Sequence, residues 1–400
     1  MNILVFNCGS SSLNCKVFHA LPSGELAPIV QAKAHHVGVQ SQEAPYIDFH
    51  YDGNTTRLDA PLPDHAAAAG AILDWLDSSR VRVDASGHRF VHGGTSLHET
   101  TRITSDNLPL LEACAPLAPL HNPAALAVIH ICRQRLGEIP LFAAFDPAFH
   151  ARMPGFASRY ALPGELRELP EMRKYGFHGL SYQYVTAETA RYLDIPVEKL
   201  RLIACHLGTG GSSAAAINGG HSVDNSMGSS PLAGLIMSTR CGDLDPTIPL
   251  TLVDKFGYTP QEVGRLLNKE SGLVGISGFS SDLFEIVARA EAGSQPARLA
   301  VDMYVHRLKR YIGAFLAVLG GCDALVFTDD IGQRCWQIRE AACRGLEPLG
   351  IVLDEDANRS ASGGETEAIN KPESPIHVLV VPTDEELVIA RDCLRLLHSE

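Results

Sequence analysis

Two short turns rich in glycine and serine are the first places where this chain could bind an anion. NCGSSSLNCK spans residues 7–16 and HLGTGGSS spans residues 206–213, and each follows a short apolar run. Small residues let backbone N–H groups approach a phosphate closely, while hydroxyl groups and Lys16 add further donors. One such turn is common at a hairpin tip. Two of them after equivalent apolar runs predict a pair of phosphate-binding turns.

Three further segments carry a charged or imidazole side chain within a short apolar run. They are HRFVHGG (88–94), FDPAFH (145–150) and RKYGFHGLSY (173–182). Charged groups at the ends of buried strands are typical of functional sites. Each segment alone could equally be a solvated strand end or a histidine bonded to backbone. The presence of three such segments favours a functional site.

The densest polar stretch is DNSMGSSPLAGLIMSTRCGDLDP, residues 224–246, which surrounds a single arginine, Arg240. It is too irregular for a helix or a strand, and a long glycine-punctuated loop in an apolar domain is more often functional than structural. A guanidinium group there can bind carboxylate or phosphate oxygens through two parallel hydrogen bonds.

Short strands frame each of the two glycine-rich turns. Residues 3–6 form an apolar run before the first turn and residues 13–20 a second run after it, which predicts a hairpin. Residues 202–206 and 214–217 repeat this arrangement around the second turn. The two halves of the chain therefore open alike, which predicts two related domains.

Strand-like and helix-like segments alternate through the rest of the chain. An apolar helix over 301–319 precedes a strand at 324–327 and a polar turn at 328–332. Residues 259–262, TPQE, combine an N-cap, a proline at the first helical position and a capping-box glutamate. This alternation predicts an α/β fold with two domains facing a shared cleft.

The length of 400 residues also exceeds what one hydrophobic core usually supports, so we expect two domains. The first should comprise residues 1–150 and be joined by the C-terminal helix, residues 383–400. The second should comprise residues 151–382, because the last apolar strand, 376–381, still belongs to it. The return of the final helix is inferred from the pattern alone.

Composition excludes several classes of protein. A net charge of -13 argues against a nucleic-acid partner. The start of the chain lacks the features of a signal peptide, and nowhere do 18 apolar residues run together, so we expect a cytoplasmic protein without a membrane partner. The ten cysteines form no C-x-x-C pair and the 17 histidines show no zinc spacing, so we expect reduced thiols and no structural zinc.

The motifs, in this order along the whole chain, resemble those of the acetate kinase family. The matching patterns are an N-x-G-S-S-S opening, H-R-x-V-H-G-G, F-D-x-A-F-H, Y-G-F-H-G-x-S, H-L-G-x-G, D-x-S-M-G-x-x-P-L-x-G-x-x-M-x-T-R-x-G-D-x-D-P and T-x-E-E-L-x-I-A. The resemblance implies duplicated actin/hexokinase-like (ribonuclease H-like) α/β domains facing a central cleft, a homodimer and bound Mg²⁺. It also implies the conversion of ATP and acetate to ADP and acetyl phosphate.

The resemblance implies a metal site at Asn7 and Glu385. Magnesium prefers few protein ligands and several waters. Glu385 has a structural alternative, because residues 383–386 also resemble a capping box, in which Glu386 suits the capping role better. Lys16 is the basic residue of the first turn, although the family often places its lysine where this chain has Asn14.

Catalytic roles follow from the same resemblance. Arg89 and Arg240 match two active-site arginines, which would stabilise charge on the transferring phosphoryl group and on the carboxylate. His178, with His121 as a second candidate, would donate a hydrogen bond to that group. Asp146 would orient Arg89 or the substrate rather than transfer a proton, because a carboxylate nucleophile arrives already ionised.

The resemblance implies two binding pockets. Apolar residues would shape the acetyl pocket, and such walls discriminate one methylene by only about 1–3 kcal/mol, so propionate would be a poorer substrate rather than an excluded one. The acetyl-pocket residues are Val91, Leu120, Phe177 and Pro231, with Arg89 beside them. The nucleotide- and phosphate-binding residues are Ser10, Ser12, Lys16, His206, Leu207, Gly208, Thr209, Gly210, Asp282, Phe284, Asp330, Ile331 and Gly332.

The chain departs from the family pattern on the nucleotide side. Residues 327–334 read FTDDIGQR where the family usually has F-T-x-G-I-G-E-N, so Asp330 replaces a glycine. Phe284 stands where the family tends to have arginine, and Thr209 where it tends to have asparagine. A carboxylate at 330 would fill space and repel phosphates unless Arg334 offsets its charge. We therefore expect weakened or altered use of ATP.

Three alternatives to an ATP-dependent acetate kinase stay open. One is a propionate or other short-chain acyl kinase. Another is an acyl kinase with a different donor, such as pyrophosphate or another nucleotide. The third is a non-catalytic ligand-binding relative, against which the intact set Asn7, Arg89, His178, Arg240 and Glu385 argues.

Overall fold

The computed structural model describes residues 1–39, 43–119 and 121–399. These residues form two compact units. The first consists of Met1–Ala148 with Asp384–Glu400, and the second of Phe149–Thr383. The domain boundary near residue 150 stays a prediction about folding units. No helix in the described ranges is long and apolar enough to cross a membrane.

The first unit is built on a sheet in the order β5-β4-β3-β2-β1-β6-β8-β7. β1 pairs with β2 antiparallel and with β6 parallel, and β6 pairs with β8 parallel. The carboxyl ends of β1, β6 and β8 therefore meet at one edge of the sheet. The strands are β1 (Asn2–Cys8), β2 (Ser12–Ala20), β3 (Leu26–His35), β4 (Tyr46–Tyr51), β5 (Asn54–Asp59), β6 (Ala85–Phe90), β7 (Thr101–Ile103) and β8 (Leu141–Phe145).

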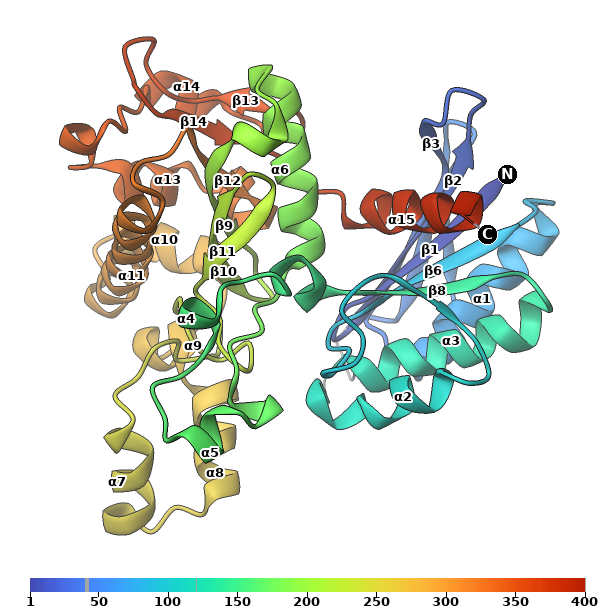
Figure 1. The fold of residues 1–400 in the computed structure, drawn as a ribbon, viewed down its shortest axis with the longest axis horizontal. Coiled ribbons are helices and arrows are strands. Elements are labelled where there is room, and N and C mark those ends of the chain that lie inside the picture. The colour runs from blue at the N-terminus through green and yellow to red at the C-terminus, as the bar shows by residue number, and fades with distance from the viewer. Residues whose placement is uncertain (40–42, 120, 400) are drawn as a thin grey trace. The chain divides into compact units, whose positions relative to one another are not determined.

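Helices cover both faces of this sheet. Figure 1 shows α15 (Glu385–Ser399) on one face, and α1 (His65–Ser78) and α3 (Asn122–Leu136) on the other. Both faces of the sheet are apolar because successive side chains of β1 point to opposite faces. Leu4 and Phe6 belong to the core beneath α1 and α3. A Cβ atom at Gly87 of β6 would lie 2.5 Å from Ile389 of α15, so this glycine lets the last helix pack closely.

The second unit is built on a sheet in the order β11-β10-β9-β12-β14-β13. β9 pairs with β10 antiparallel and with β12 parallel, and β12 pairs with β14 parallel. The arrangement around β9 thus repeats that around β1, with a hairpin partner on one side and a parallel partner on the other. The strands are β9 (Arg201–Leu207), β10 (Ser212–Asn218), β11 (His221–Asn225), β12 (Ala324–Thr328), β13 (Glu367–Ala368) and β14 (His377–Val380).

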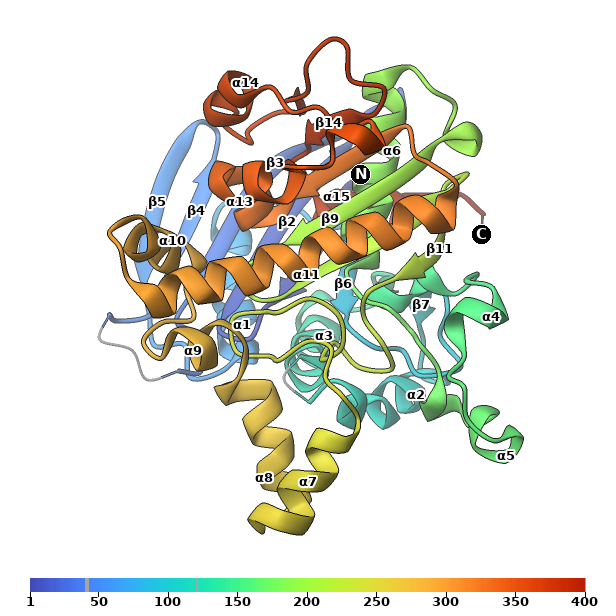
Figure 2. The same cartoon turned by 90° about the vertical axis from the view of Figure 1, so that its left-hand side faces the viewer.

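Two cores flank this second sheet. Ile203 and Cys205 pack in the core that contains the long helix α11 (Gln295–Leu319), which Figure 2 shows lying along the sheet. Leu202 and Ala204 pack on the opposite side, with α6 (Gly179–Leu193). The predicted hairpins and the predicted α/β class are confirmed by these two sheets.

The remaining helices connect these elements, and the capping box predicted at residues 259–262 is present at the start of α8. The other α-helices are α2 (Leu108–Ala113), α4 (Gly155–Ser158), α5 (Gly164–Arg167), α7 (Thr247–Phe256), α8 (Pro260–Arg265), α9 (Gly272–Ser277), α10 (Leu283–Glu291), α12 (Asp329–Arg334), α13 (Trp336–Cys343) and α14 (Glu355–Ser360). Short 3₁₀ segments are Ala115–Leu117, Asp146–His150, Pro170–Met172, Val197–Lys199 and Glu347–Leu349, and Leu266–Glu270 is a π-helical turn.

Candidate active site

In the first unit, an arginine is held at the edge where three parallel strands end. Arg89 of β6 donates from Nε and Nη2 to the two carboxylate oxygens of Asp146, at 2.8 and 2.6 Å. Its Nη1 donates to Oδ1 of Asn7 at 3.1 Å and lies 3.3 Å from Oε2 of Glu385. Burial alone would lower the pKa of Arg89, but the carboxylates of Asp146 and Glu385 raise it well above its usual range. Arg89 is therefore a fixed, permanent cation.

Asn7 connects this arginine to the start of the last helix. Its Nδ2 donates to Oε2 of Glu385 and to Oε1 of Glu386, both at 3.0 Å. Asp384 caps α15, because its Oδ1 accepts from the backbone N–H of Leu387 at 2.9 Å. The capping box considered for residues 383–386 as a structural alternative is therefore wrong. Asp384 is the cap, and Glu386 instead accepts a hydrogen bond from the side-chain amide of Asn7.

Lys16 of β2 lies against the same acidic helix start. Its Nζ is 2.9 Å from Oδ2 of Asp384 and 3.4 Å from Oε2 of Glu386. Burial tends to lower the pKa of Lys16, but Glu386 and Asp384 raise it. The lysine thus balances acidic charge beside the first turn, in which Ser10 is exposed, Ser12 is half-buried and the N–H of Gly9 donates to the carbonyl of Ser12 at 2.9 Å.

The charge balance of this cluster suits a divalent cation. Two cations, Lys16 and Arg89, face four carboxylates, which leaves two negative charges uncompensated. The amide and carboxylate oxygens of Asn7 and Glu385 are the hard donors that Mg²⁺ prefers, and Mg²⁺ needs few protein ligands. No group of three or more His, Cys, Asp or Glu side chains in a metal-binding arrangement occurs among the described residues. Asn7 and Glu385 therefore offer only two ligands, and water would have to supply most of the shell of a bound Mg²⁺.

In the second unit, glycines of the second turn make room for charged groups. Backbone N–H groups of Gly208 and Gly211 donate to each other's carbonyl oxygens at 3.1 and 3.3 Å. A Cβ atom at Gly211 would lie 3.3 Å from Nη1 of Arg240 and 3.6 Å from Nε2 of His178. The structure thus brings these two side chains to the same point of the turn.

Arg240 carries a positive charge that protein carboxylates leave unneutralised. Its Nη1 donates to the carbonyl of Pro231 at 3.3 Å, and no ion pair joins it to a carboxylate of the described residues. Burial lowers the pKa of Arg240, which shows that its charge is poorly solvated. An anion at this point would restore the missing counter-charge. Arg89, in contrast, already has its carboxylates.

His178 adopts a left-handed conformation at the start of α6, with φ of 59°, which is uncommon for a residue other than glycine. His150 helps to hold it, since Nε2 of His150 donates to the carbonyl of Phe177 at 3.0 Å. The Nδ1 atom of His178 lies 2.8 Å from Oγ of Ser213. These contacts aim Nε2 of His178 toward the turn.

A second histidine stacks on the first. The rings of His178 and His206 lie 4.1 Å apart and are nearly parallel. His206 contacts Ser181 through Nδ1 at 2.9 Å and Asp329 through Nε2 at 3.1 Å. Both Ser213 and Asp329 lie in segments that the sequence analysis identified, 206–213 and 327–334, but neither was assigned a role, because their histidine partners are evident only from the fold.

The departures from the family pattern contact one another in pairs. Thr209 donates from Oγ1 to Oδ2 of Asp330 at 3.0 Å. The guanidinium carbon of Arg334 lies 5.3 Å from the ring centre of Phe284. The predicted phosphate or nucleotide contact Asp282 serves as the N-cap of α10, where it accepts from the N–H of Phe284.

The other predicted residues have simpler surroundings. Val91 is buried in the first unit, where His121 is the N-cap residue of α3 without a side-chain cap. Leu120 lies outside the described residues. In the second unit Phe177, Leu207, Ile331 and Gly332 are buried, Pro231 is half-buried and Gly210 is exposed.

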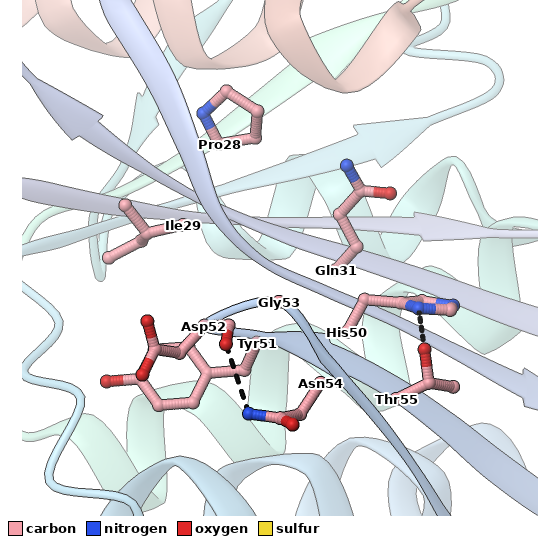
Figure 3. Close-up of a pocket in the computed structure, with 9 residues that line it drawn as sticks. All are labelled: Pro28, Ile29, Gln31, His50, Tyr51, Asp52, Gly53, Asn54 and Thr55. Atoms are coloured by element: carbon pink, nitrogen blue, oxygen red, sulfur yellow. Dashed lines mark hydrogen bonds between the residues drawn. The ribbon is translucent and has the colours of Figure 1, made fainter.

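A separate groove of about 770 Å³ lies on β3, β4 and β5 of the first unit (Figure 3). Polar groups line it, and within it Nδ1 of His50 lies 2.8 Å from Oγ1 of Thr55. None of the predicted site residues lines this groove. The charged clusters around Arg89 and around Arg240 contribute no residue to the lining of this groove and contain the groups that could act on an anionic substrate.

Comparison with known proteins agrees with this chemistry. Residues 2–391 match the model of the acetokinase family. The chain is 42% identical to the acetate kinase of Halothermothrix orenii over the whole length of both, and 42% identical to acetate kinase 2 of Clostridium perfringens, again over the whole length of both.

Solved structures give the same result. The acetate kinase of Entamoeba histolytica has a TM-score of 0.89 and 39% identity, with both chains covered completely. The acetate kinase of Porphyromonas gingivalis has a TM-score of 0.88 and 39% identity over 99% of each chain. A propionate kinase of Francisella tularensis has a TM-score of 0.88 and 35% identity over 98% of each chain.

Proposed function

Because the chain belongs to the acetokinase family and is a phosphotransferase with a carboxyl group as acceptor, we propose that it transfers a phosphoryl group reversibly from ATP to acetate, giving ADP and acetyl phosphate. The observation that carries the proposal is the convergence of the half-buried Arg240 and Nε2 of His178 on Gly211, where no ion pair joins Arg240 to a carboxylate of the described residues. This is the arrangement that a transferring phosphoryl group requires.

The steps follow from the groups present. Acetate is already ionised at neutral pH, so the reaction needs no general base. Its carboxylate oxygen attacks the γ-phosphorus atom of ATP, and the bond from that phosphorus to the bridging oxygen breaks, leaving ADP. Negative charge on the equatorial oxygens is stabilised by Arg240 and by the N–H of His178. In the first unit Asp146 positions Arg89, to which the family resemblance assigns a role in the same reaction.

We assign Asn7 and Glu385 as the residues that would hold Mg²⁺, with Glu386 beside them. When bound, Mg²⁺ neutralises charge on the phosphates of the nucleotide. Asn7 also accepts from Arg89, so the arginine and the metal-binding oxygens are held by one hydrogen-bonded cluster. This connection keeps the geometry of the first unit fixed.

A mutational test addresses the two arginines. Arg89→Ala and Arg240→Ala should each lower kcat by about 10²-fold or more, because each removes charge stabilisation that grows in the transition state. Lysine at either position should rescue only partly, since it cannot form two parallel hydrogen bonds. The exposed Arg57→Ala and Arg191→Ala are controls within the same two units. Near-wild-type turnover of either alanine variant would remove that arginine from the site.

The phosphate donor has a second candidate, favoured by the paired departures on the nucleotide side. Asp330 holds Thr209, and Arg334 lies against Phe284, so these side chains stabilise each other in place of a glycine-rich turn. An acyl kinase that uses another donor, such as pyrophosphate or another nucleotide, fits this arrangement. A donor screen with acetate, trapping acetyl phosphate with hydroxylamine, separates the candidates. No product with any donor would favour a non-catalytic relative.

The acyl substrate is proposed to be acetate, with propionate used less well. Val91, Phe177 and Pro231 are assigned to the acetyl pocket, and apolar walls discriminate one methylene by about 1–3 kcal/mol. We expect kcat/KM for propionate to be about tenfold or more below that for acetate. Equal values for the two acids would contradict this assignment.

We also propose a cytoplasmic homodimer. Helix α7 buries none of its side chains within the second unit, and Leu250 and Phe256 are 64% and 68% exposed. Apolar side chains gathered on one helix are typical of a surface that a partner covers. A second copy of the chain is the occupant that the family resemblance implies. Light scattering after size exclusion measures the mass directly.

A further inference from the structure

Two buried tyrosine–serine pairs lie on opposite faces of β10. Ser213 faces α6, where its Oγ is 2.5 Å from the hydroxyl of Tyr182. Ser212 faces α11, where its Oγ is 3.0 Å from the hydroxyl of Tyr304. All four side chains are buried, and the two pairs are alike in chemistry. They differ in one respect, because only Ser213 also contacts a histidine of the candidate site, His178.

The direction of the hydrogen bonds in the first pair follows from the tyrosine. Burial raises the pKa of Tyr182 far above its usual range, so the phenol keeps its proton. Ser213 is the only side chain of the described residues that is hydrogen-bonded to this hydroxyl. A buried donor needs an acceptor, so Tyr182 donates to Oγ of Ser213.

The direction of the hydrogen bond between Ser213 and His178 follows from that of the first. Once Oγ of Ser213 accepts from Tyr182, its own proton is directed to Nδ1 of His178, which lies 2.8 Å away. If Nδ1 of His178 donated instead, Oγ of Ser213 would accept two hydrogen bonds, and its own buried proton would have no acceptor among the described residues. A nitrogen that accepts carries no proton, so the neutral ring has its proton on Nε2.

Charged groups around His178 disfavour a second proton on its ring. Nε2 of His206 lies 3.1 Å from the carboxylate of Asp329, so this nitrogen donates to the carboxylate. The two imidazoles stack at 4.1 Å, and Arg240 approaches the same turn. An imidazolium at His178 would face the guanidinium of Arg240, which carries a like charge.

We propose that Tyr182 and Ser213 are positioning residues that hold His178 as the neutral Nε2–H tautomer, so that a ready N–H donor faces Gly211 and Arg240. The proposal rests on the proposed function, in which that N–H meets the transferring phosphoryl oxygens. A donor whose proton is already in place costs no rearrangement when charge develops. In the other tautomer, the lone pair of Nε2 would face the anion and repel it.

The tautomer itself can be measured without any reaction. In ¹⁵N-histidine-labelled protein at pH 8, His178 should show an unprotonated Nδ1 and a protonated Nε2, with the signals assigned by loss in His178→Gln. Ser213→Ala should move both signals toward an average of the two tautomers, whereas Ser212→Ala should leave them unchanged. Unchanged His178 signals in Ser213→Ala would overturn the proposal.

Kinetics test the consequence for the reaction. Ser213→Ala and Tyr182→Phe should lower kcat about tenfold, the factor that one neutral hydrogen bond supplies, with KM for acetate within about twofold of wild type. Ser212→Ala and Tyr304→Phe, the matched controls, should stay within about twofold in both constants. Ser213→Thr keeps the hydroxyl and should retain both the tautomer and most of the turnover. His178→Gln offers a neutral N–H donor, so it should be more active than His178→Ala.

The outcomes distinguish this inference from the proposed function. Equal losses in both tyrosine–serine pairs would mean general destabilisation and would overturn the positioning role. A wild-type protein that forms no acyl phosphate with any donor would refute the proposed function. The NMR comparison of Ser213→Ala with Ser212→Ala would still decide whether the hydroxyls fix the tautomer.

Discussion

The buried histidine of β6 gives a quantitative prediction about stability and pH. His88 is 1% exposed, its Nε2 lies 3.1 Å from Oγ of Ser86, and its Nδ1 has no hydrogen-bond partner within the described ranges. Its ring stacks on Phe6 with centres 6.0 Å apart. Burial lowers the pKa of His88 from 6.5 to about 3. The folded protein therefore keeps this ring neutral in mildly acidic solution.

The sign of the effect follows from proton uptake. Above the unfolded pKa of 6.5 neither state binds a proton at His88, and the full stability is present. As the pH falls below that value, the unfolded chain takes up a proton that the folded protein cannot bind. Each pH unit costs about 1.4 kcal/mol, so the loss is about 2 kcal/mol at pH 5 and about 4 kcal/mol at pH 3, where the folded ring itself begins to bind the proton.

Urea unfolding of the first unit measures this loss. Trp75 packs on Phe49 in that unit, so its fluorescence reports the unit in a Trp336→Phe background. Between pH 8 and pH 5, the free energy of unfolding should fall by about 2 kcal/mol more in wild type than in His88→Gln. The exposed His130→Gln should retain the wild-type dependence. Parallel pH profiles of wild type and His88→Gln would refute the reasoning.

Three further changes have defined outcomes. Asp330 lies in the first turn of helix α12, where the sequence predicts a polar turn, and Asp330→Gly should lower KM for ATP about fivefold, as expected for a like-charge contact of about 1 kcal/mol. Equal KM values would show that the carboxylate is neutral toward ATP. Gly211→Ala places a methyl group 3.3 Å from Nη1 of Arg240, so kcat should fall at least about tenfold with little change in melting temperature. A large loss of stability instead would contradict a role confined to the site. Phe256→Ser, which removes an exposed apolar side chain of α7, should shift the light-scattering mass toward the monomer, and an unchanged dimer would exclude this surface.

The sequence by itself determined the local elements and the kind of chemistry. Apolar runs on both sides of a glycine-rich turn were sufficient to predict the hairpins β1–β2 and β9–β10, because strand periodicity and turn composition are local properties. The capping box at Thr259 was predictable for the same reason. The motif set was also specific enough to indicate the acetokinase family, which the family match confirms.

Tertiary structure alone decided how the side chains are paired. Asn7 and Glu385 are 378 residues apart, and their hydrogen bond depends on where α15 packs on the sheet. The cap of α15 was predicted wrongly, since a threonine followed three residues later by a glutamate fits a capping box locally, whereas contacts with Asn7 and Lys16 draw Glu386 away from the helix end.

The same holds for the second unit. Nothing in the sequence distinguishes Ser213 from Ser212, because both follow the same glycine turn and both become buried. The strand alternation sends them to opposite faces, and the helices that cover those faces decide which one meets His178. Local patterns fix the conformation of a segment, but the partner of a buried polar group is set by strand order and register, which are properties of the folded chain.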